Sequence, residues 1–241
     1  MSELRWHPLL EEWVTLAPWR QDRTYHPDAA HCPLCPTRPG MAETEIPESD
    51  YHIVVFENRG EEIGVTLSHP HGQIYAYPFI PPVLERELAS ESKHMRKTGR
   101  CLYCDVIAGE EDGVRTVLRD ERWIAFVPPF ARWPYEVHLA PTSHRGDLLD
   151  LDDQDDLSFA TSLKGLLQKY DRLFQRPLPY VMAMHQKPRG RGGRHHHFHV
   201  EFYPPNRTRD KLKYLAGSEL GAGAFILDAR AEDTAAELRA L

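Results

Sequence analysis

The sequence of 241 residues has no apolar run long enough to span a membrane, and Met1 to Arg5 lack the apolar core of a signal peptide. It also lacks an excess of positive charge, because 29 Lys and Arg stand against 36 Asp and Glu for a formal net charge of −7. A nucleic-acid-binding surface would need the opposite balance. We therefore expect a cytoplasmic protein with no membrane and no nucleic acid among its partners.

Cysteine is scarce. The chain has only four, and they form two Cys-x-x-Cys pairs, Cys32/Cys35 and Cys101/Cys104. In a reducing compartment this spacing favours zinc binding or redox chemistry over disulfides. The 41% hydrophobic content is that of an ordinary globular protein, and the 20 prolines predict many extended segments and few long helices.

Hydrophobic periodicity predicts a mixed α+β chain. The clearest helix is expected over 150–174, where apolar residues recur at spacings of three and four. Further helices are expected over 81–100 and 232–241. Over 6–18 a strand entered from a turn is expected, with Trp13, Val14 and Leu16 as its apolar residues. Further strands are expected over 53–58, 74–80, 116–118, 123–127, 135–139, 180–185 and 195–203.

The chain also contains an internal repeat. Cys32-x-x-Cys35 followed by His69-x-His71-x-Gln73 is echoed by Cys101-x-x-Cys104 followed by His197-x-His199-x-Glu201. The repeat predicts two halves, 1–80 and 81–241, of which the first is much the shorter. In the second half it predicts a tetrahedral zinc site of Cys101, Cys104, His144 and His197. The alternative for His195 to His197 is a solvated polyhistidine run beside the basic loop 189–194.

The segment Ser68-His69-Pro70-His71-Gly72-Gln73 carries the strongest chemical pattern. The proline keeps the backbone extended, so the two imidazoles start from the same face. One imidazole can ligate a metal while the other stays free as a nucleophile or base, and the Gln73 amide could hold a phosphoryl oxygen. Arg20 and Arg23 could hold a phosphate, although a solvated basic pair is the simpler interpretation.

These residues carry a resemblance to a known family. Phe56-Glu57-Asn58-Arg59-Gly60, Gly64 and His69-Pro70-His71-Gly72-Gln73-Ile74-Tyr75-Ala76 resemble the active-site signature of galactose-1-phosphate uridylyltransferases, members of the histidine-triad superfamily. The resemblance continues through Trp133-Pro134-Tyr135-Glu136 and Lys211 to Gly223, and it covers almost the whole chain. It implies an α+β fold of two pseudo-repeated histidine-triad-like halves with antiparallel sheets and flanking helices, the first half being shortened.

The activity implied by the resemblance is the exchange of UMP between UDP-glucose and galactose-1-phosphate, in a homodimer. His71 would be the nucleophile that becomes uridylylated, and Gln73 would hold the transferring phosphoryl group. Zinc would be bound by Cys32, Cys35 and His69. The nucleotide site would be lined by Arg20, Arg23, Asn58, Gly64 and Thr66. Lys213 and Glu219 would contact the hexose phosphate.

The chain departs from this family in two places. Relatives carry a long segment before the Phe-Glu-Asn block, whereas residues 50–59 here join the two flanks of that segment directly. His52 is the only histidine between the Cys32/Cys35 pair and His69. Glu201 stands where many relatives have a histidine. Some relatives bind a second structural metal, zinc or iron, and the matching positions here are Glu87, His185 and His199. This assignment of the second metal competes with the one to Cys101, Cys104, His144 and His197. The alternatives are a related nucleotide-sugar or dinucleotide phosphorylase or hydrolase, or an inactive zinc-binding remnant.

Overall fold

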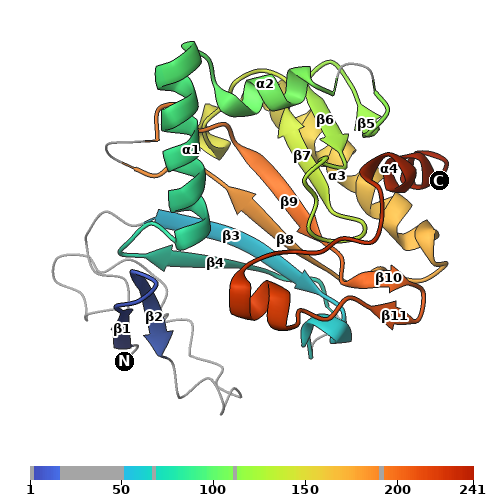
Figure 1. Ribbon diagram of the computed structural model, residues 1–241. Helices are drawn as coiled ribbons and strands as arrows, with labels where there is room; N and C mark the ends of the chain where they lie inside the picture. Colours follow the sequence, from blue (N-terminus) through green and yellow to red (C-terminus); the bar gives the residue numbers. More distant parts are fainter. Residues whose placement is uncertain (1–2, 17–51, 67–68, 111–112, 190–192) are drawn as a thin grey trace, which may run out of the picture.

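The structure is a computed structural model and describes residues 3–16, 52–66, 69–110, 113–189 and 193–241. Its main element is a seven-stranded sheet with the order β4-β3-β8-β9-β7-β6-β5, in which every pairing is antiparallel (Figure 1). The strands are β3 (His52–Arg59), β4 (Gly72–Tyr77), β5 (Thr116–Arg119), β6 (Trp123–Phe126), β7 (Val137–Pro141), β8 (Tyr180–His185) and β9 (His199–Tyr203). The antiparallel α+β fold expected from the sequence is therefore confirmed. Strands β3 and β4 of the shorter half continue the sheet of the longer half through β8.

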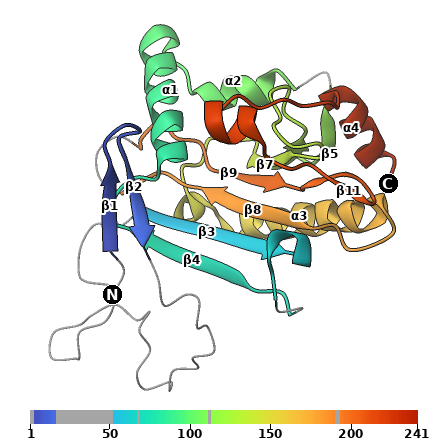
Figure 2. The ribbon, with the colours of Figure 1, turned by 60° about the horizontal axis from the view of Figure 1, so that its bottom comes forward.

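Within the described ranges, four α-helices flank this sheet. They are α1 (Pro82–Thr98), α2 (Leu102–Ala108), α3 (Asp153–Leu173) and α4 (Ala231–Arg239). Helices α1 and α2 lie on one face and α3 lies on the other, with α4 beside α3 near β5 (Figures 1 and 2). None of the described helices combines the length and apolar composition needed to cross a membrane.

Alternation along the strands divides their side chains between the two faces of the sheet. In β6, Trp123 and Ala125 join the core beneath α3 and α4, whereas Ile124 and Phe126 pack against Tyr103 of α2. In β7, β8 and β9 the same alternation sends the apolar residues toward α3. The polar residues left on the face of α1 and α2 are His138, His185, His199 and Glu201.

The start of helix α3 and the face that it buries follow from its own sequence. Asp152 and Asp155 form a capping box, which starts the helix at Asp153 and confirms the helix predicted over 150–174. Its apolar stripe includes Leu166 and Tyr170, both fully buried in the core. The helices expected over 81–100 and 232–241 are likewise present as α1 and α4.

Three local expectations need correction. The strand entered from a turn that was expected over 6–18 is present as β2 (Glu12–Leu16), after a turn that ends at Glu11 with a φ of 53°, and residues 17–18 lie outside the described residues. The prediction missed β1 (Glu3–His7), which pairs with β2 as a hairpin. The strand expected from residue 195 begins only at His199, because Phe198 N–H donates to the carbonyl of Arg145 outside the sheet. The Cys101/Cys104 pair lies at the start of helix α2, which was not predicted.

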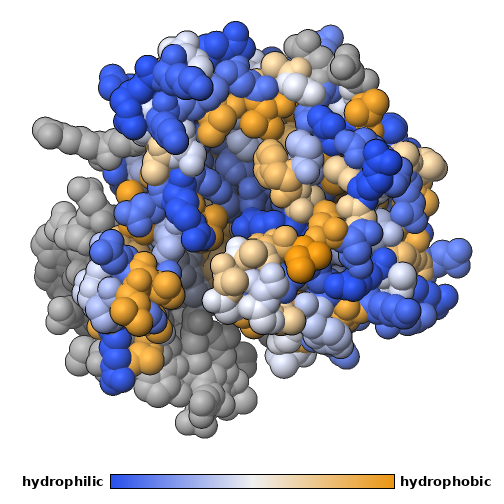
Figure 3. All heavy atoms as spheres, in the orientation of Figure 1, coloured by the Kyte–Doolittle hydropathy of each residue, from blue (hydrophilic) through white to orange (hydrophobic). Residues whose placement is uncertain are grey.

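The hairpin and the C-terminal segment complete the described chain. Trp6 and Trp13 pack edge to face at 5.1 Å but stay 47% and 42% exposed. The aliphatic residues Leu9, Leu10 and Val14 of the same hairpin are exposed as well, and Figure 3 shows hydrophobic residues at the lower left, where the hairpin lies. The C-terminal segment contains β10 (Asn206–Thr208), β11 (Lys211–Leu212) and a π-helical turn over Gly217–Gly221. Single 3₁₀ turns occur at Glu61–Ile63 and Leu148–Asp150.

The packing of α3 gives a stability prediction with an internal control. Leu166→Ala removes a fully buried side chain and should lower the free energy of unfolding by about 2–5 kcal/mol. Leu157→Ala, at a position of the same helix that is 64% exposed, should change it by less than about 0.5 kcal/mol. Urea unfolding followed by circular dichroism measures both, and equal losses at the two positions would contradict this packing of α3.

Candidate metal sites and the candidate active-site strand

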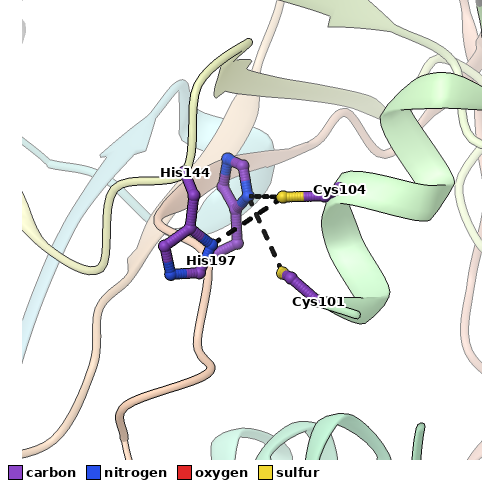
Figure 4. A group of neighbouring side chains, drawn as sticks. All are labelled: Cys101, Cys104, His144 and His197. Atoms are coloured by element: carbon purple, nitrogen blue, oxygen red, sulfur yellow. Dashed lines mark hydrogen bonds between the residues drawn. The ribbon is translucent and has the colours of Figure 1, made fainter. Parts of the chain in front are cut away.

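Two cysteines and two histidines converge beside the first turn of α2 (Figure 4). The Cys104 Sγ lies 3.3 Å from His197 Nδ1 and 3.8 Å from His144 Nδ1, and the Cys101 Sγ lies 4.0 Å from His197 Nδ1. His197 Nε2–H donates to the carbonyl of Pro141 at 2.9 Å, which leaves Nδ1 free to face the cysteines. We call Cys101, Cys104, His144 and His197 the thiolate set.

The electrostatics of the thiolate set suit a metal ion. The hydrogen bond from Cys104 lowers the pKa of the Cys101 thiol, and the contact with His197 lowers it further, although burial opposes both. A thiolate is the form of cysteine that ligates metals. Two cysteines and two imidazoles in a tetrahedral arrangement are the usual ligands of a structural zinc site.

A second group of metal-binding residue types lies on the face of the sheet that α1 covers. All of its ligand atoms lie within 4.8 Å of one another. The group consists of Glu87 from α1, His185 from β8, and His199 and Glu201 from β9. We call it the carboxylate set.

The hydrogen bonds of the carboxylate set orient both of its imidazoles. His185 Nδ1 lies 3.0 Å from each carboxylate oxygen of Glu87, and its Nε2 lies 3.9 Å from Glu201. His199 Nδ1–H donates to the carbonyl of His197 at 2.8 Å, so its Nε2 points to Glu201 at 3.4 Å. Burial lowers the pKa of His185, but the charges of Glu201 and Glu87 outweigh burial and raise that pKa to about 9.

The two metal assignments left open by the sequence are therefore compatible, because they use different residues. The interpretation of His195 to His197 as a solvated run is wrong for two of the three. His196 and His197 are fully buried, and His196 Nδ1 lies 3.0 Å from a carboxylate oxygen of Glu91.

Sequence reasoning missed the buried polar residues between the two sets. Tyr103 lies inside the second Cys-x-x-Cys pair, and its hydroxyl donates to His138 Nδ1 at 2.9 Å. On the other side of the ring, His138 Nε2 lies 3.2 Å from Glu136 and 3.3 Å from Glu201. The alternation of Glu136 with His138 on a predicted strand was a signal in the sequence, but their partners depend on strand register.

The candidate nucleophile lies at the start of the edge strand β4. His71 is exposed, and its Nδ1–H donates to the carbonyl of His69 at 3.0 Å, so the lone pair is on Nε2, which has no hydrogen bond among the described residues. Gln73 accepts a hydrogen bond from the Tyr75 hydroxyl at 3.3 Å, which leaves its amide N–H₂ able to donate. The β3–β4 register pairs Glu57 with Gly72, and its continuation by one pair sets Asn58 opposite His71.

The remaining predicted site residues are scattered. Gly64 follows the 3₁₀ turn with a φ of 83°, in the left-handed region that favours glycine, and Thr66 is exposed nearby in the chain. Lys213 Nζ is buried, donates to the carbonyl of Ile226 and lies 4.0 Å from Glu219. Outside the described residues lie Arg20, Arg23, Cys32 and Cys35. The zinc site expected from Cys32, Cys35 and His69 thus stays a prediction.

Comparison with known proteins first places the chain in a structural class. A solved structure described as "Structure of uridylyltransferase" is 31% identical, matches 100% of this chain and 98% of its own, and superposes with a TM-score of 0.84. The fold described above is thus that of uridylyltransferases.

Sequence comparison narrows this class to a family. The model "Galactose-1-phosphate uridyl transferase, C-terminal domain" matches residues 87–241, and the corresponding N-terminal domain model matches residues 45–81. The galactose-1-phosphate uridylyltransferase of Thermotoga maritima is 33% identical over 99% of this chain and 98% of its own length. The chain belongs to the galactose-1-phosphate uridylyltransferase family.

The same comparisons show that this chain is shorter than its relatives. The alignment with the Thermotoga maritima protein extends over 313 positions, although this chain has 241 residues, so the relative has residues where this chain has none. Against the galactose-1-phosphate uridylyltransferase of Haemophilus influenzae, which is 38% identical, the match covers 78% of this chain but only 55% of the relative.

The buried histidine at the start of β3 gives a pH prediction. Burial, followed by the positive charges of His196 and His185, lowers the pKa of His52 to about 4, below its value of about 6.5 in an unfolded chain. The unfolded state therefore binds the proton more readily, and stability should fall as the pH drops from about 6.5 to about 4. His52→Asn should flatten this part of the profile in urea unfolding at several pH values. An unchanged slope would contradict the burial of a neutral His52.

The two metal sets give a second prediction. Cys104→Ser and His185→Ala should each reduce the metal content of the purified protein by about one ion per chain, because each removes one ligand from a different set. His94→Gln is the matched control, since His94 pairs with Asp105 and belongs to neither set. Elemental analysis by mass spectrometry measures all three variants. Equal metal content in Cys104→Ser and in the control would show that the thiolate set binds no metal.

Proposed function

We propose that the protein is a nucleotidyltransferase that exchanges UMP between UDP-glucose and galactose-1-phosphate through a uridylylated His71. Membership of the family supports the reaction. The observation that supports the nucleophile is that His71 is exposed and uses Nδ1 for its hydrogen bond to His69, so that Nε2 carries the lone pair. The hydrogen bond at Nδ1 holds the tautomer in which Nε2 carries the lone pair. A neutral imidazole of this kind attacks without a separate base.

The two half-reactions balance with the substrates alone. His71 Nε2 forms a bond to the α-phosphorus of UDP-glucose as the bond from that phosphorus to the bridging oxygen breaks, and glucose-1-phosphate leaves. A phosphate oxygen of galactose-1-phosphate then attacks the same phosphorus, which releases His71 and yields UDP-galactose. The amide of Gln73 would donate to a non-bridging oxygen during both steps.

The other predicted residues complete this proposal. Asn58, Gly64 and Thr66 would contact the nucleotide together with Arg20 and Arg23. Lys213 and Glu219 would contact the hexose phosphate, and for this Lys213 would exchange its bond to the Ile226 carbonyl for one to the phosphate.

Zinc is the metal that we propose for the thiolate set, because its ligands are two cysteines and two imidazoles. The carboxylate set suits zinc or iron(II), since imidazole and carboxylate are ligands of both. We propose zinc also for Cys32, Cys35 and His69. These ions would be structural and would stabilise the fold.

We further propose a cytoplasmic homodimer. β4 forms one edge of the seven-stranded sheet, so among the described residues no further strand pairs with the outer side of the strand that follows His71. A second copy against this side would cover the surface that the longer first half covers in relatives.

The decisive test is the intact mass of the protein after incubation with UDP-glucose. The expected result is a gain of one UMP, absent in His71→Ala and retained in the control His94→Gln. Gln73→Ala should form the same adduct about 100-fold more slowly, because it removes one donor to the transferring group.

The acceptor is then identified by adding candidates to the labelled protein. Galactose-1-phosphate should remove the label and give UDP-galactose. Removal by inorganic phosphate alone would identify a phosphorylase, and removal by water alone a hydrolase. No adduct in a protein that holds its metal would show that the chain is an inactive remnant.

A further inference from the structure

Tyr103 lies between the thiolate set and the carboxylate set and contacts a ligand of each. Its ring stacks on His199 with the centroids 4.3 Å apart and the planes at 18°, and it packs on His197 at 5.4 Å. Tyr103 is only 8% exposed, so little solvent separates the two sets at this point. Because it lies between Cys101 and Cys104 in the chain, it moves with the first turn of α2.

The hydroxyl of Tyr103 extends this contact to Glu201 of the carboxylate set. It donates to His138 Nδ1, and the Nε2–H on the other side of that ring faces the carboxylates of Glu136 at 3.2 Å and Glu201 at 3.3 Å. Strand register sets His138 directly opposite Glu201. Hydrogen bonds to ligating carboxylates and imidazoles orient them, and loss of such partners typically weakens metal binding about 10- to 100-fold.

A backbone contact joins the two sets independently. His199 Nδ1–H donates to the carbonyl of His197 at 2.8 Å, so the main chain of one candidate ligand holds the ring of another. The ring of His197 is held in turn by the carbonyl of Pro141 at 2.9 Å. An ion that orders His197 therefore also orders the ring of His199.

We propose that Tyr103 and His138 couple the two sets energetically, so that a divalent transition-metal ion in one set raises the affinity of the other. The inference rests on the metal binding proposed above. Tyr103 and His138 are positioning residues that touch the ligands and not the ion. Because coupling between two binding equilibria is reciprocal, each ion raises the affinity of the other by the same factor.

Cobalt(II) bound to thiolate has a charge-transfer absorption that imidazole and carboxylate ligands do not produce. All variants, and the protein used as wild type, carry Cys32→Ser and Cys35→Ser, so that Cys101 and Cys104 are the only cysteines of the chain and the absorption reports on the thiolate set. His185→Ala disables the carboxylate set without touching a thiolate ligand. We expect this substitution to weaken cobalt binding at the thiolate set about tenfold when Tyr103 is present. In Tyr103→Leu, which removes the ring and the hydroxyl, the same substitution should weaken it less than twofold.

Two further variants define which contact carries the coupling. Tyr103→Phe keeps the stacked ring and loses the bond to His138, so the tenfold effect of His185→Ala should fall to about threefold. If Tyr103→Leu does not fold, the comparison of Tyr103→Phe with the wild-type residue tests the proposal in its place. Tyr170→Phe is the matched control, because it removes a buried tyrosine hydroxyl that donates to the Tyr135 carbonyl beneath α3. The control should leave the tenfold effect intact.

The outcomes separate the two proposals. A charge-transfer band with equal affinity in the wild-type protein and in His185→Ala would overturn the coupling and leave the thiolate metal site standing. A tenfold effect that persists in both Tyr103 variants would show that the path does not run through Tyr103. The absence of any charge-transfer band would overturn both the metal proposal and the inference. The proposed reaction is tested independently, by the labelling of His71.

Discussion

The register of β9 between β8 and β7 is the constraint on which this molecule depends. It sets His199 opposite His185 on one side and Glu201 opposite His138 on the other. Side chains paired in this way start about 4.5–5.5 Å apart at Cβ, so three strands bring four polar groups together without help from a loop. A slip of one residue would turn His199 and Glu201 into the apolar core beneath α3 and turn Val200 and Phe202 toward α1 and α2, where the polar residues lie.

Helix α1 shows how this polar face is closed. Leu84 is the only apolar residue of the helix that is fully buried, and its other inward contacts are Glu87 with His185 and Glu91 with His196. Pairs of buried acids and imidazoles lose much of their attraction to desolvation. One oxygen of Glu91 and the Nε2 of His196 have no protein partner among the described residues. A cation in the carboxylate set would supply the attraction that apolar packing supplies to α3.

Much of this arrangement could be predicted from the sequence, and the failures have physical causes. The helices α1, α3 and α4 and the strands of the sheet follow from periodicity and capping residues, which are local. The thiolate set followed from one Cys-x-x-Cys pair and the repeat. Tyr103 and His138 could not be found in this way, because their partners come from strand register and ring stacking between distant segments. Strand β1 of the hairpin was missed because the turn before β2 lacks the glycine or asparagine that usually indicates a hairpin.

The pairing of β3 with β8 has a consequence for biosynthesis. Val55 lies opposite Met184, so the hairpin that bears His71 forms from neighbouring residues but joins the sheet only through a strand made about 130 residues later. At about 5–20 residues per second, a growing chain would expose the free edge of β3 for on the order of 10 s. Contacts of such long range also slow folding. The newly made hairpin is therefore a segment that an emerging chain must keep from pairing with other strands. The strand of the candidate nucleophile reaches its final place only after β8 has been made.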